Sequence, residues 1–424
     1  MTIARILTRR DTAANWASVN PVLSAGEQGY ETDTGKLKIG DGSTPWNLLD
    51  YDIDAFLNQS TALSGQVLSW NGNDYVWVNH PTRPLGAPGP FYGPRGLFGG
   101  GDDQFNPVVN TITYITIDTP GTSIDFGDLT VARETPAACS DGTYGVFGGG
   151  YQSSGSAVNV IDYVTIATTG NAVDFGDFSD ISRAEMAACS NGTRGVFAGF
   201  TNAMHYVTIA TPGNSANFGD LIVVVESLAS CSDGTRGIFA GGNLVTSGTD
   251  VNAIQYVTID TAGTAINFGD LLSPRRAIAS CSDETYGIFG GETYSTNQNI
   301  EYITIATLGN ATGFGDLTVS RRNLASCSNG TRGVFGGGSF YSNVIDYVTI
   351  ATPGNATNFG DLSIVKMELS SCSDGNYGLF AGGKTSSSTV FNTIEYVTIN
   401  TPGNVVDFGD LTIARRNLAA CSGA

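Results

Sequence analysis

The sequence predicts an all-β protein whose larger part, residues 95–424, is a β-propeller of seven four-stranded blades. Three observations support this fold class. A segment with one cysteine recurs at intervals of about 47 residues, a period found in propellers and in armadillo-type helix pairs. Each repeat contains four short runs rich in Val, Ile, Thr, Phe and Tyr, separated by turn residues. Since no run is long enough for a helix, the propeller is favoured.

One repeat shows how the four strands of a blade are expected to follow one another. Asn329-Gly330 joins the first two runs, and this dipeptide is a strong hairpin signal because both residues tolerate positive φ. Thr352-Pro353-Gly354-Asn355 joins the last two, with Pro setting φ and Gly accepting the positive value. The unit is therefore an up-and-down antiparallel sheet. Its four runs are 324–328, 333–337, 344–352 and 357–364.

The two ends of the repeat region complete one another. Residues 415–424 contain the first strand of a repeat without the second. Residues 95–101 supply a second strand that has no first strand before it. Pairing of these segments would complete a seventh blade and close the ring, which removes the exposed edges of an open array.

Three recurring features have the same order as in a known family. They are an arginine before the first strand, a glycine doublet after the second, and a later tyrosine, as in Arg321, Gly336-Gly337 and Tyr347. In this order the region resembles the kelch-type propellers. Phe of Phe-Gly-Asp stands where kelch repeats usually carry Trp. The repeat with Ala198-Gly199-Phe200 departs most, since almost no loop follows its second strand.

Composition limits the classes of partner and compartment. The net charge of −19 opposes binding to phosphate backbones, so we expect no nucleic-acid partner. No apolar run approaches 18 residues, and the chain starts with polar sequence, so we expect neither membrane insertion nor a signal peptide. Synthesis in the cytosol follows from this expectation.

The seven cysteines occupy one position of the repeat, in the strand expected to be innermost. We interpret them as small buried hydrophobes, with a redox or metal ring as the alternative. The two histidines, His80 and His205, have no spaced Cys, Asp or Glu that would complete a metal site. We therefore expect no metal and no cofactor. The equivalent cysteines are Cys139, Cys189, Cys231, Cys281, Cys327, Cys372 and Cys421.

Candidate catalytic groups recur with the repeat, whereas catalysis usually breaks symmetry at one place. We interpret the aspartate of each Phe-Gly-Asp as a hydrogen-bond partner of turn backbone. The arginine pairs Arg275-Arg276, Arg321-Arg322 and Arg415-Arg416 predict blade-to-blade ion pairs, with a binding face as the alternative. No set of nucleophile, base and orienting group is found, so we expect no enzyme. The aspartates are Asp128, Asp177, Asp220, Asp270, Asp316, Asp361 and Asp410.

Residues 1–52 form a different, β-rich module. Asp11 is expected to cap a short helix that runs through Trp16 and ends before Asn20-Pro21, and residues 28–31 and 36–39 to pair as strands. The ordered segments 9–16, 21–23, 26–35, 38–42 and 46–47 resemble the small N-terminal module of bacteriophage tail fibres and of the major tropism determinant family. The resemblance implies attachment to other virion proteins and assembly as a homotrimer.

Two short segments separate this module from the propeller. Residues 53–79 contain a predicted hairpin around 71–74, with Trp70 or Trp77 expected to be buried against a neighbour. Residues 80–94, rich in Pro and Gly, are expected to form a semi-rigid linker.

The expected binding surface is the face that carries the loops between second and third strands, since these vary while the turns at the other end hardly do. With the resemblance, this predicts a virion tail fibre or spike subunit whose propeller binds a host-surface glycan or protein. A head-decoration or baseplate protein and, less favoured, a capsular polysaccharide depolymerase are the alternatives; the latter needs two carboxylates in an asymmetric cleft. Seven loop aromatics are receptor-binding candidates: Phe105, Tyr151, Phe200, Tyr294, Phe340, Tyr341 and Phe391.

Overall fold

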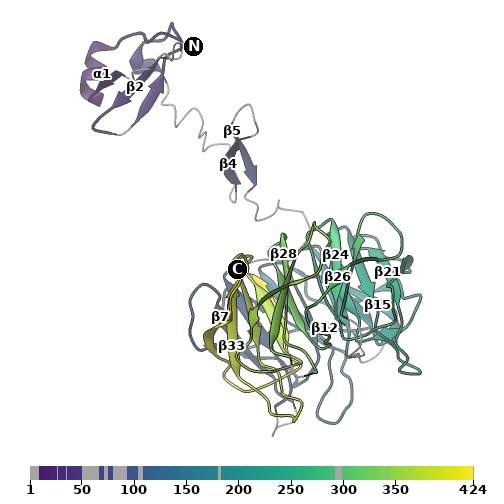
Figure 1. Cartoon of the computed structure of the whole chain (residues 1–424). Coiled ribbons are helices and arrows are strands. Elements are labelled where there is room, and N and C mark those ends of the chain that lie inside the picture. The colour runs from purple at the N-terminus through teal and green to yellow at the C-terminus, as the bar shows by residue number, and fades with distance from the viewer. Residues whose placement is uncertain are drawn as a thin grey trace. The chain divides into compact units, whose positions relative to one another are not determined.

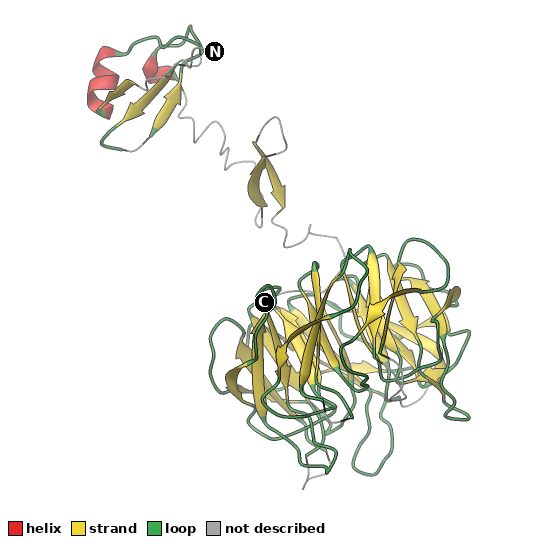
Figure 2. Cartoon of the chain, viewed as in Figure 1, coloured by secondary structure: helices red, strands yellow, loops and turns green. Residues whose placement is uncertain are grey.

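The computed structural model divides the chain into two compact units, Met1–Leu85 and Gly86–Ala424 (Figure 1). In the part that is described, helix occurs in the first unit alone and the second is built from strands and loops (Figure 2). The structure describes residues 9–25, 27–34, 36–49, 66–70, 75–79, 93–103, 108–179, 183–291, 298–340 and 342–423.

The N-terminal unit packs a short helix and a 3-10 turn on a three-stranded sheet. Strand β2 pairs with β1 in parallel and with β3 in antiparallel orientation. The rings of Trp16 and Trp46 stack with centroids 4.2 Å apart and form its core with Leu23. The elements are β1 (Arg9–Asp11), α1 (Ala13–Val19), β2 (Gln28–Glu31), β3 (Leu37–Ile39) and η1 (Trp46–Leu48).

The helix of this unit differs from the prediction at its N-terminus. Thr12, not Asp11, is the N-cap of α1, and its hydroxyl accepts a hydrogen bond from Asn15 N at 3.3 Å. Asp11 instead accepts from the backbone N–H of Thr12. The predicted end of the helix before Asn20 is confirmed, since Asn20 is the C-cap and its left-handed conformation directs its N–H to Trp16 O. Asparagine tolerates that conformation.

The predicted hairpin is present. Strands β4 (Gln66–Trp70) and β5 (Tyr75–Asn79) pair in antiparallel orientation with Trp70 opposite Tyr75. The expected burial of Trp70 or Trp77 concerns side chains outside the described ones. The predicted linker lies outside the described residues except for its last two.

Four-stranded antiparallel sheets make up the second unit, and seven occur among the described residues. Each sheet is named below by its first, innermost strand. The innermost strands are β9 (Ala137–Ser140), β13 (Ala187–Ser190), β18 (Ala229–Ser232), β23 (Ala279–Ser282), β27 (Ala325–Ser328), β31 (Ser370–Ser373) and β35 (Ala419–Gly423).

The remaining strands follow in the same order of sheets. The second strands are β10 (Tyr144–Gly148), β14 (Arg194–Gly199), β19 (Arg236–Ala240), β24 (Tyr286–Gly290), β28 (Arg332–Gly336), β32 (Tyr377–Ala381) and β6 (Arg95–Gly99). The third strands are β11 (Val160–Thr165), β15 (Thr201–Thr208), β21 (Ala253–Thr258), β25 (Asn299–Thr304), β29 (Val344–Thr349), β33 (Thr393–Thr398) and β7 (Thr111–Thr116). The fourth strands are β12 (Val173–Asp177), β16 (Ala216–Asp220), β22 (Ile266–Asp270), β26 (Thr312–Asp316), β30 (Thr357–Asp361), β34 (Val406–Asp410) and β8 (Ile124–Asp128). A two-stranded sheet of β17 (Val225–Glu226) and β20 (Asn243–Leu244) accompanies them.

The two ends of the repeat region pair as the sequence predicts. Strand β35 lies antiparallel to β6, with Ala419 opposite Gly99 and Gly423 opposite Arg95. The innermost strand β35 also contacts β31 on one side and β9 on the other. This repeated all-β arrangement is consistent with a β-propeller.

A cysteine and a glycine join each pair of consecutive sheets. The Sγ of Cys372 in β31 packs against Gly96 in β6, where a Cβ atom would lie 2.6 Å from the sulfur. Cys421 in β35 packs against Gly145 in β10 in the same way, at 2.8 Å. Any side chain at these glycines would overlap the sulfur, so glycine is required there. The other pairs are Cys139 with Gly195, Cys189 with Gly237, Cys231 with Gly287, Cys281 with Gly333 and Cys327 with Gly378.

The Phe-Gly-Asp segments also join consecutive sheets, but through the backbone. The N–H of Asp316 donates to Asn355 Oδ1 in the turn of the next sheet at 3.1 Å. A Cβ atom on Gly315 would overlap the carbonyl of Gly354 in that turn. The prediction that these aspartates bond to turn backbone is confirmed at Asp316, whose backbone carbonyl accepts from the N–H of Ala356 at 2.8 Å.

A buried ion pair lies inside four of the described sheets. Arg321 before β27 contacts Asp346 on β29 at 2.9 Å, and both side chains are fully buried. Asp346 also accepts from the N–H of Thr318, which follows the last strand of the preceding sheet. The predicted blade-to-blade ion pair is therefore wrong for this arginine, whose acid is in its own sheet. The other pairs are Arg133 with Asp162, Arg275 with Glu301 and Lys366 with Glu395.

The second arginine of a pair does bridge sheets. Arg416 contacts Asp102 at 2.6 Å in its own sheet and Glu368 at 2.7 Å in the segment that enters β31. The predicted ion pair between consecutive blades is present at this residue. Exposed to water on one side, such a pair stabilises the fold by about 1 kcal/mol or less.

Three sheets replace the buried acid. In the β18 sheet Val225 and Gln255 stand at the two positions, and Gln255 Oε1 accepts from Ile222 N at 2.6 Å. In the β35 sheet Arg415 donates to Thr113 Oγ1 at 2.8 Å, and burial lowers the pKa of Arg415 to about 9. In the β13 sheet His205 stands at the position of the acid.

The β18 sheet, with Val225 and Gln255 in place of the ion pair, indicates how another sheet should respond when its ion pair is replaced in the same way. We expect Arg321→Val to lower the free energy of unfolding by about 3–5 kcal/mol, because it leaves the buried Asp346 carboxylate without its cation. Adding Asp346→Gln should recover most of this loss, since the neutral pair recreates the β18 arrangement. Urea unfolding measures both. A double variant as unstable as the single one would contradict the explanation.

Candidate functional site

One end of the sheets collects the segments that differ most between repeats. Strands alternate in direction, so the connections between second and third strands emerge at the same end as those that enter the first strands. We call this end the loop face. Four candidate aromatics, Tyr151, Phe200, Phe340 and Phe391, are described. The other three, Phe105, Tyr294 and Tyr341, lie outside the described residues.

Two of the four described candidates come together. Tyr151 follows β10, and its backbone exchanges hydrogen bonds of 2.9 Å with Glu134. Phe200 alone connects β14 to β15, at a φ of 68°. The two rings meet edge to face with centroids 6.2 Å apart and planes at 81°. Both side chains are half-buried, so each keeps an accessible part.

Carboxylates lie close enough to the Tyr151 hydroxyl to affect its pKa. Burial raises the pKa of Tyr151 to about 12, and the charges of Glu185, Glu226 and Glu134 add to the shift. Each of these glutamates accepts a side-chain hydrogen bond from a neutral donor. The donors are Asn417 for Glu134 at 2.9 Å, Ser227 for Glu185 at 2.5 Å and Asn243 for Glu226 at 2.9 Å.

The other two described candidates have different surroundings. Phe340 is 40% exposed at a φ of 67°, and the Arg322 guanidinium lies 5.9 Å from the centre of its ring. Phe391 is half-buried, and its N–H donates to Gly383 O at 2.9 Å. Arg322 brings positive charge to Phe340, while glutamates bring negative charge to Tyr151. The loop face is therefore electrostatically uneven.

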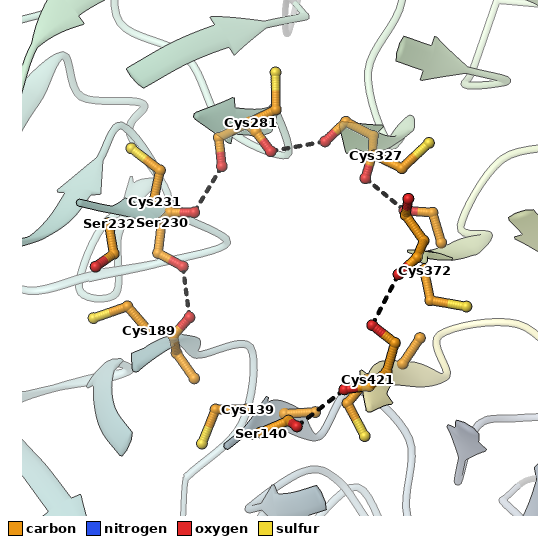
Figure 3. Close-up of a pocket in the computed structure, with 18 of the residues that line it drawn as sticks. Cys139, Ser140, Cys189, Ser230, Cys231, Ser232, Cys281, Cys327, Cys372 and Cys421 are labelled. Carbon is orange, nitrogen blue, oxygen red and sulfur yellow. Dashed lines mark hydrogen bonds between the residues drawn. The ribbon is translucent and has the colours of Figure 1, made fainter. Parts of the chain in front are cut away.

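A central cavity of about 310 Å³ lies between the innermost strands. Figure 3 shows the cysteines around it with their sulfur atoms turned away from its centre. Serine and alanine side chains and strand backbone face the cavity. Its lining consists of Ala138–Ser140, Ala188–Ser190, Ser230–Ser232, Ser280–Ser282, Ser326–Ser328, Ser371–Ser373 and Ala420–Ser422.

Serine hydroxyls connect neighbouring innermost strands around the cavity. Ser140 Oγ donates to Ser422 O at 3.0 Å, and Ser422 Oγ donates to Ser373 O at 3.0 Å. These bonds link β9, β35 and β31, so the chain ends take part in the same pattern as the other sheets. Comparable bonds run from Ser190 to Ser140, Ser282 to Ser232, Ser328 to Ser282 and Ser373 to Ser328.

The cysteines are free and buried, as the interpretation of them as small hydrophobes expects. Burial raises the pKa of Cys189, Cys327 and Cys421 to about 12 and that of the other four thiols likewise. A neutral thiol is neither a nucleophile nor a metal ligand at neutral pH. Within the described ranges no three His, Cys, Asp or Glu side chains are placed to hold a metal ion.

The two histidines have separate outcomes. His205 is buried, and its Nδ1 lies 2.9 Å from Ser215 Oγ. It stands opposite Phe197 on β14, at the position that carries an acid in four other sheets. His205 is therefore part of the interior of its sheet. His80 lies outside the described residues.

Sequence reasoning found the aromatic candidates but missed the glutamates beside them. Glu134 and Glu226 directly follow the buried positions of Arg133 and Val225, and Glu185 follows Arg183 by two residues. Their closeness to that buried position was the available signal, since it places them in the segments that enter the first strands on the loop face. Nothing in one linear sequence pairs Tyr151 with Phe200, which belongs to the next sheet.

Comparison with known proteins concerns the N-terminal unit. Residues 6–44 match the family described as Major tropism determinant N-terminal domain. The matched segment contains α1 and β1 to β3. The unit is similar to that domain, which relates the protein to phage tropism and tail-fibre proteins and to the virion. A search of curated proteins finds no match to the chain. No helix in the described part of the chain is long and apolar enough to cross a membrane.

The raised thiol pKa values predict a loss of stability at high pH. Below pH 9 thiols are protonated in both states, so they favour neither. Above pH 9 the unfolded chain releases thiol protons while the folded chain retains them until about pH 12. We therefore expect the urea midpoint to fall between pH 8.5 and 10.5, roughly in proportion to the number of titrating thiols.

Native thiols should also resist iodoacetamide at pH 8.5. Rapid labelling without unfolding would contradict their burial.

Proposed function

We propose that the protein is a bacteriophage virion component, a tail-fibre or spike subunit that attaches to other virion proteins through residues 1–52. The support is the match of residues 6–44 to the tropism-determinant domain. In this proposal three copies assemble as a homotrimer, and the protein enters the virion after synthesis in the host cytoplasm. A head-decoration or baseplate role remains the structural alternative.

We further propose that residues 95–424 form a closed, seven-bladed, kelch-like propeller. Support comes from the β35 to β6 pairing and from the Cys–Gly contacts at this joint, which match those between other sheets. The proposal predicts seven sectors in electron-microscopy class averages viewed along the central cavity. Any other number, or an open ring, would overturn it.

The loop face is the proposed binding surface for a host glycan or protein. Rigid sheets hold it, and exposed parts of Tyr151 and Phe200 form an aromatic pair on it. Aromatic rings offer flat apolar area together with a hydroxyl, which suits sugar faces and protein surfaces. The three glutamates around Tyr151 favour ligands with donors or positive charge over acidic ones.

Binding without catalysis is part of the proposal. The cavity presents hydroxyls whose protons are donated to neighbouring carbonyls, and the thiols beside it stay protonated. The loop-face glutamates lie near a tyrosine, Tyr151, that is protonated at neutral pH, and burial raises the pKa of Tyr151 further. None of these groups is a poised nucleophile or base.

Adsorption to host cells tests the binding surface. We expect Tyr151→Ala combined with Phe200→Ala to reduce binding of the purified full-length protein by about tenfold or more, the equivalent of 1.4 kcal/mol. The control is Val406→Ser, which removes a 53% exposed apolar residue from an outermost strand. Retained folding is checked by the thermal midpoint. Equal binding by the aromatic variant and the control would contradict the assignment of this surface.

A further inference from the structure

Two turns on the face opposite the loop face contain an Asn-Gly dipeptide. Asn191-Gly192 joins β13 to β14, and Asn329-Gly330 joins β27 to β28. In the first turn Asn191 Oδ1 accepts from the N–H groups of Thr193 at 3.0 Å and Arg194 at 2.8 Å. Asn329 has the same two bonds, from Thr331 and Arg332. Both glycines have positive φ, 81° and 78°.

We propose that Asn191 and Asn329 are sites of spontaneous deamidation, and that conversion of Asn191 releases a contact between consecutive sheets. The backbone nitrogen of the following glycine attacks Asn Cγ and forms a new C–N bond. The Cγ–Nδ2 bond breaks, the glycine amide proton is transferred through water to the leaving nitrogen, and ammonia departs. Water then opens the cyclic imide to aspartate or isoaspartate, so no other reactant is needed.

Geometry at the turn favours this attack. Glycine has no side chain to shield its nitrogen, and asparagine is among the chemically labile residues of proteins. The two N–H groups that bind Asn191 Oδ1 draw charge from Cγ. They also stabilise the negative charge that develops on this oxygen, as the donors of an oxyanion hole do. The turn is partly exposed, so water reaches it.

Comparison between repeats explains why asparagine is present. Aspartate occupies this position in four other turns, and Asp141 Oδ1 accepts the same two backbone bonds. Asparagine adds a donor, and Asn191 Nδ2 donates to Asp260 Oδ1 in the next sheet at 2.6 Å. Asn329 Nδ2 donates to Asn400 Oδ1 at 3.0 Å. The positions that correspond to Asp260 beside three of the aspartate turns are Ala210, Ala306 and Ala351.

One repeat already carries the combination that deamidation would create. Asp374 is its turn residue, and Asp118 occupies the position that corresponds to Asp260. Asp118 Oδ1 instead accepts from Thr119 Oγ1 at 3.0 Å. A threonine also follows Asp260, so after conversion of Asn191 the Asp260 carboxylate turns to Thr261 and the contact between sheets is lost. The sheets themselves stay folded, as they do beside Asp374.

Peptide mass mapping tests the chemistry. The full-length folded protein, incubated at mildly alkaline pH, should convert both asparagines at least as fast as the urea-unfolded chain does. Release of ammonia should match the conversion. The proposal is overturned if the folded protein retains both amides while the unfolded chain loses them.

Substitution tests the consequence separately. Asn191→Asp should lower the thermal midpoint, because it removes a donor and faces Asp260 with a like charge. Adding Asp260→Asn should restore the midpoint, since the new amide donates to the new carboxylate. Asn329→Asp is the matched control, because Asn400 can donate to its carboxylate. Equal losses in the Asn191 and Asn329 variants, or no loss in either, would overturn the role of the Asn191 contact.

Discussion

The larger unit depends on how closely consecutive sheets approach. The Cys–Gly contacts leave no room for even one added carbon, and the Phe-Gly-Asp glycines lie equally close to the neighbouring turn. Such contacts bury backbone as well as side chains, so each sheet must satisfy polar groups of the next. The serine hydroxyls and the turn asparagines do so by accepting or donating across the same boundary. Close packing between sheets therefore requires hydrogen bonding between them, so the two act on the sequence together.

Electrostatics inside the sheets is less uniform than this packing. Removing an ion pair from water is costly, and the gain from pairing often only offsets that cost. The neutral Val225 and Gln255 pair in the β18 sheet fits this balance. The acid or amide at this position accepts a bond from backbone of the preceding sheet in the four ion-paired sheets and in the β18 sheet, as Asp346 does from Thr318. The backbone contact explains the position better than the charge does.

Much of the fold could be predicted because repetition multiplies each weak local signal. Asn-Gly turns, the four strand runs and the pairing of the chain ends all follow from the repeat and its phase. Contacts between different repeats could not be predicted this way. The sequence does not show whether Asp316 reaches the next turn with its carboxylate or with its backbone groups. It also does not show whether the acid that pairs with Arg321 lies in the same sheet or in the next one. These choices depend on distances set by packing.

The same limit applies to the candidate site, and it bears on how a repeat protein acquires a binding surface. Symmetry cannot produce one special place, so recognition requires repeats that depart from the pattern. The β13 sheet departs most, since Phe200 replaces an entire loop. Shortening that connection places Phe200 against Tyr151 of the preceding sheet, and glutamates that accept hydrogen bonds from neutral donors lie near Tyr151. This change thus produces a local surface with its own charge and shape, while the shared packing beneath it stays the same.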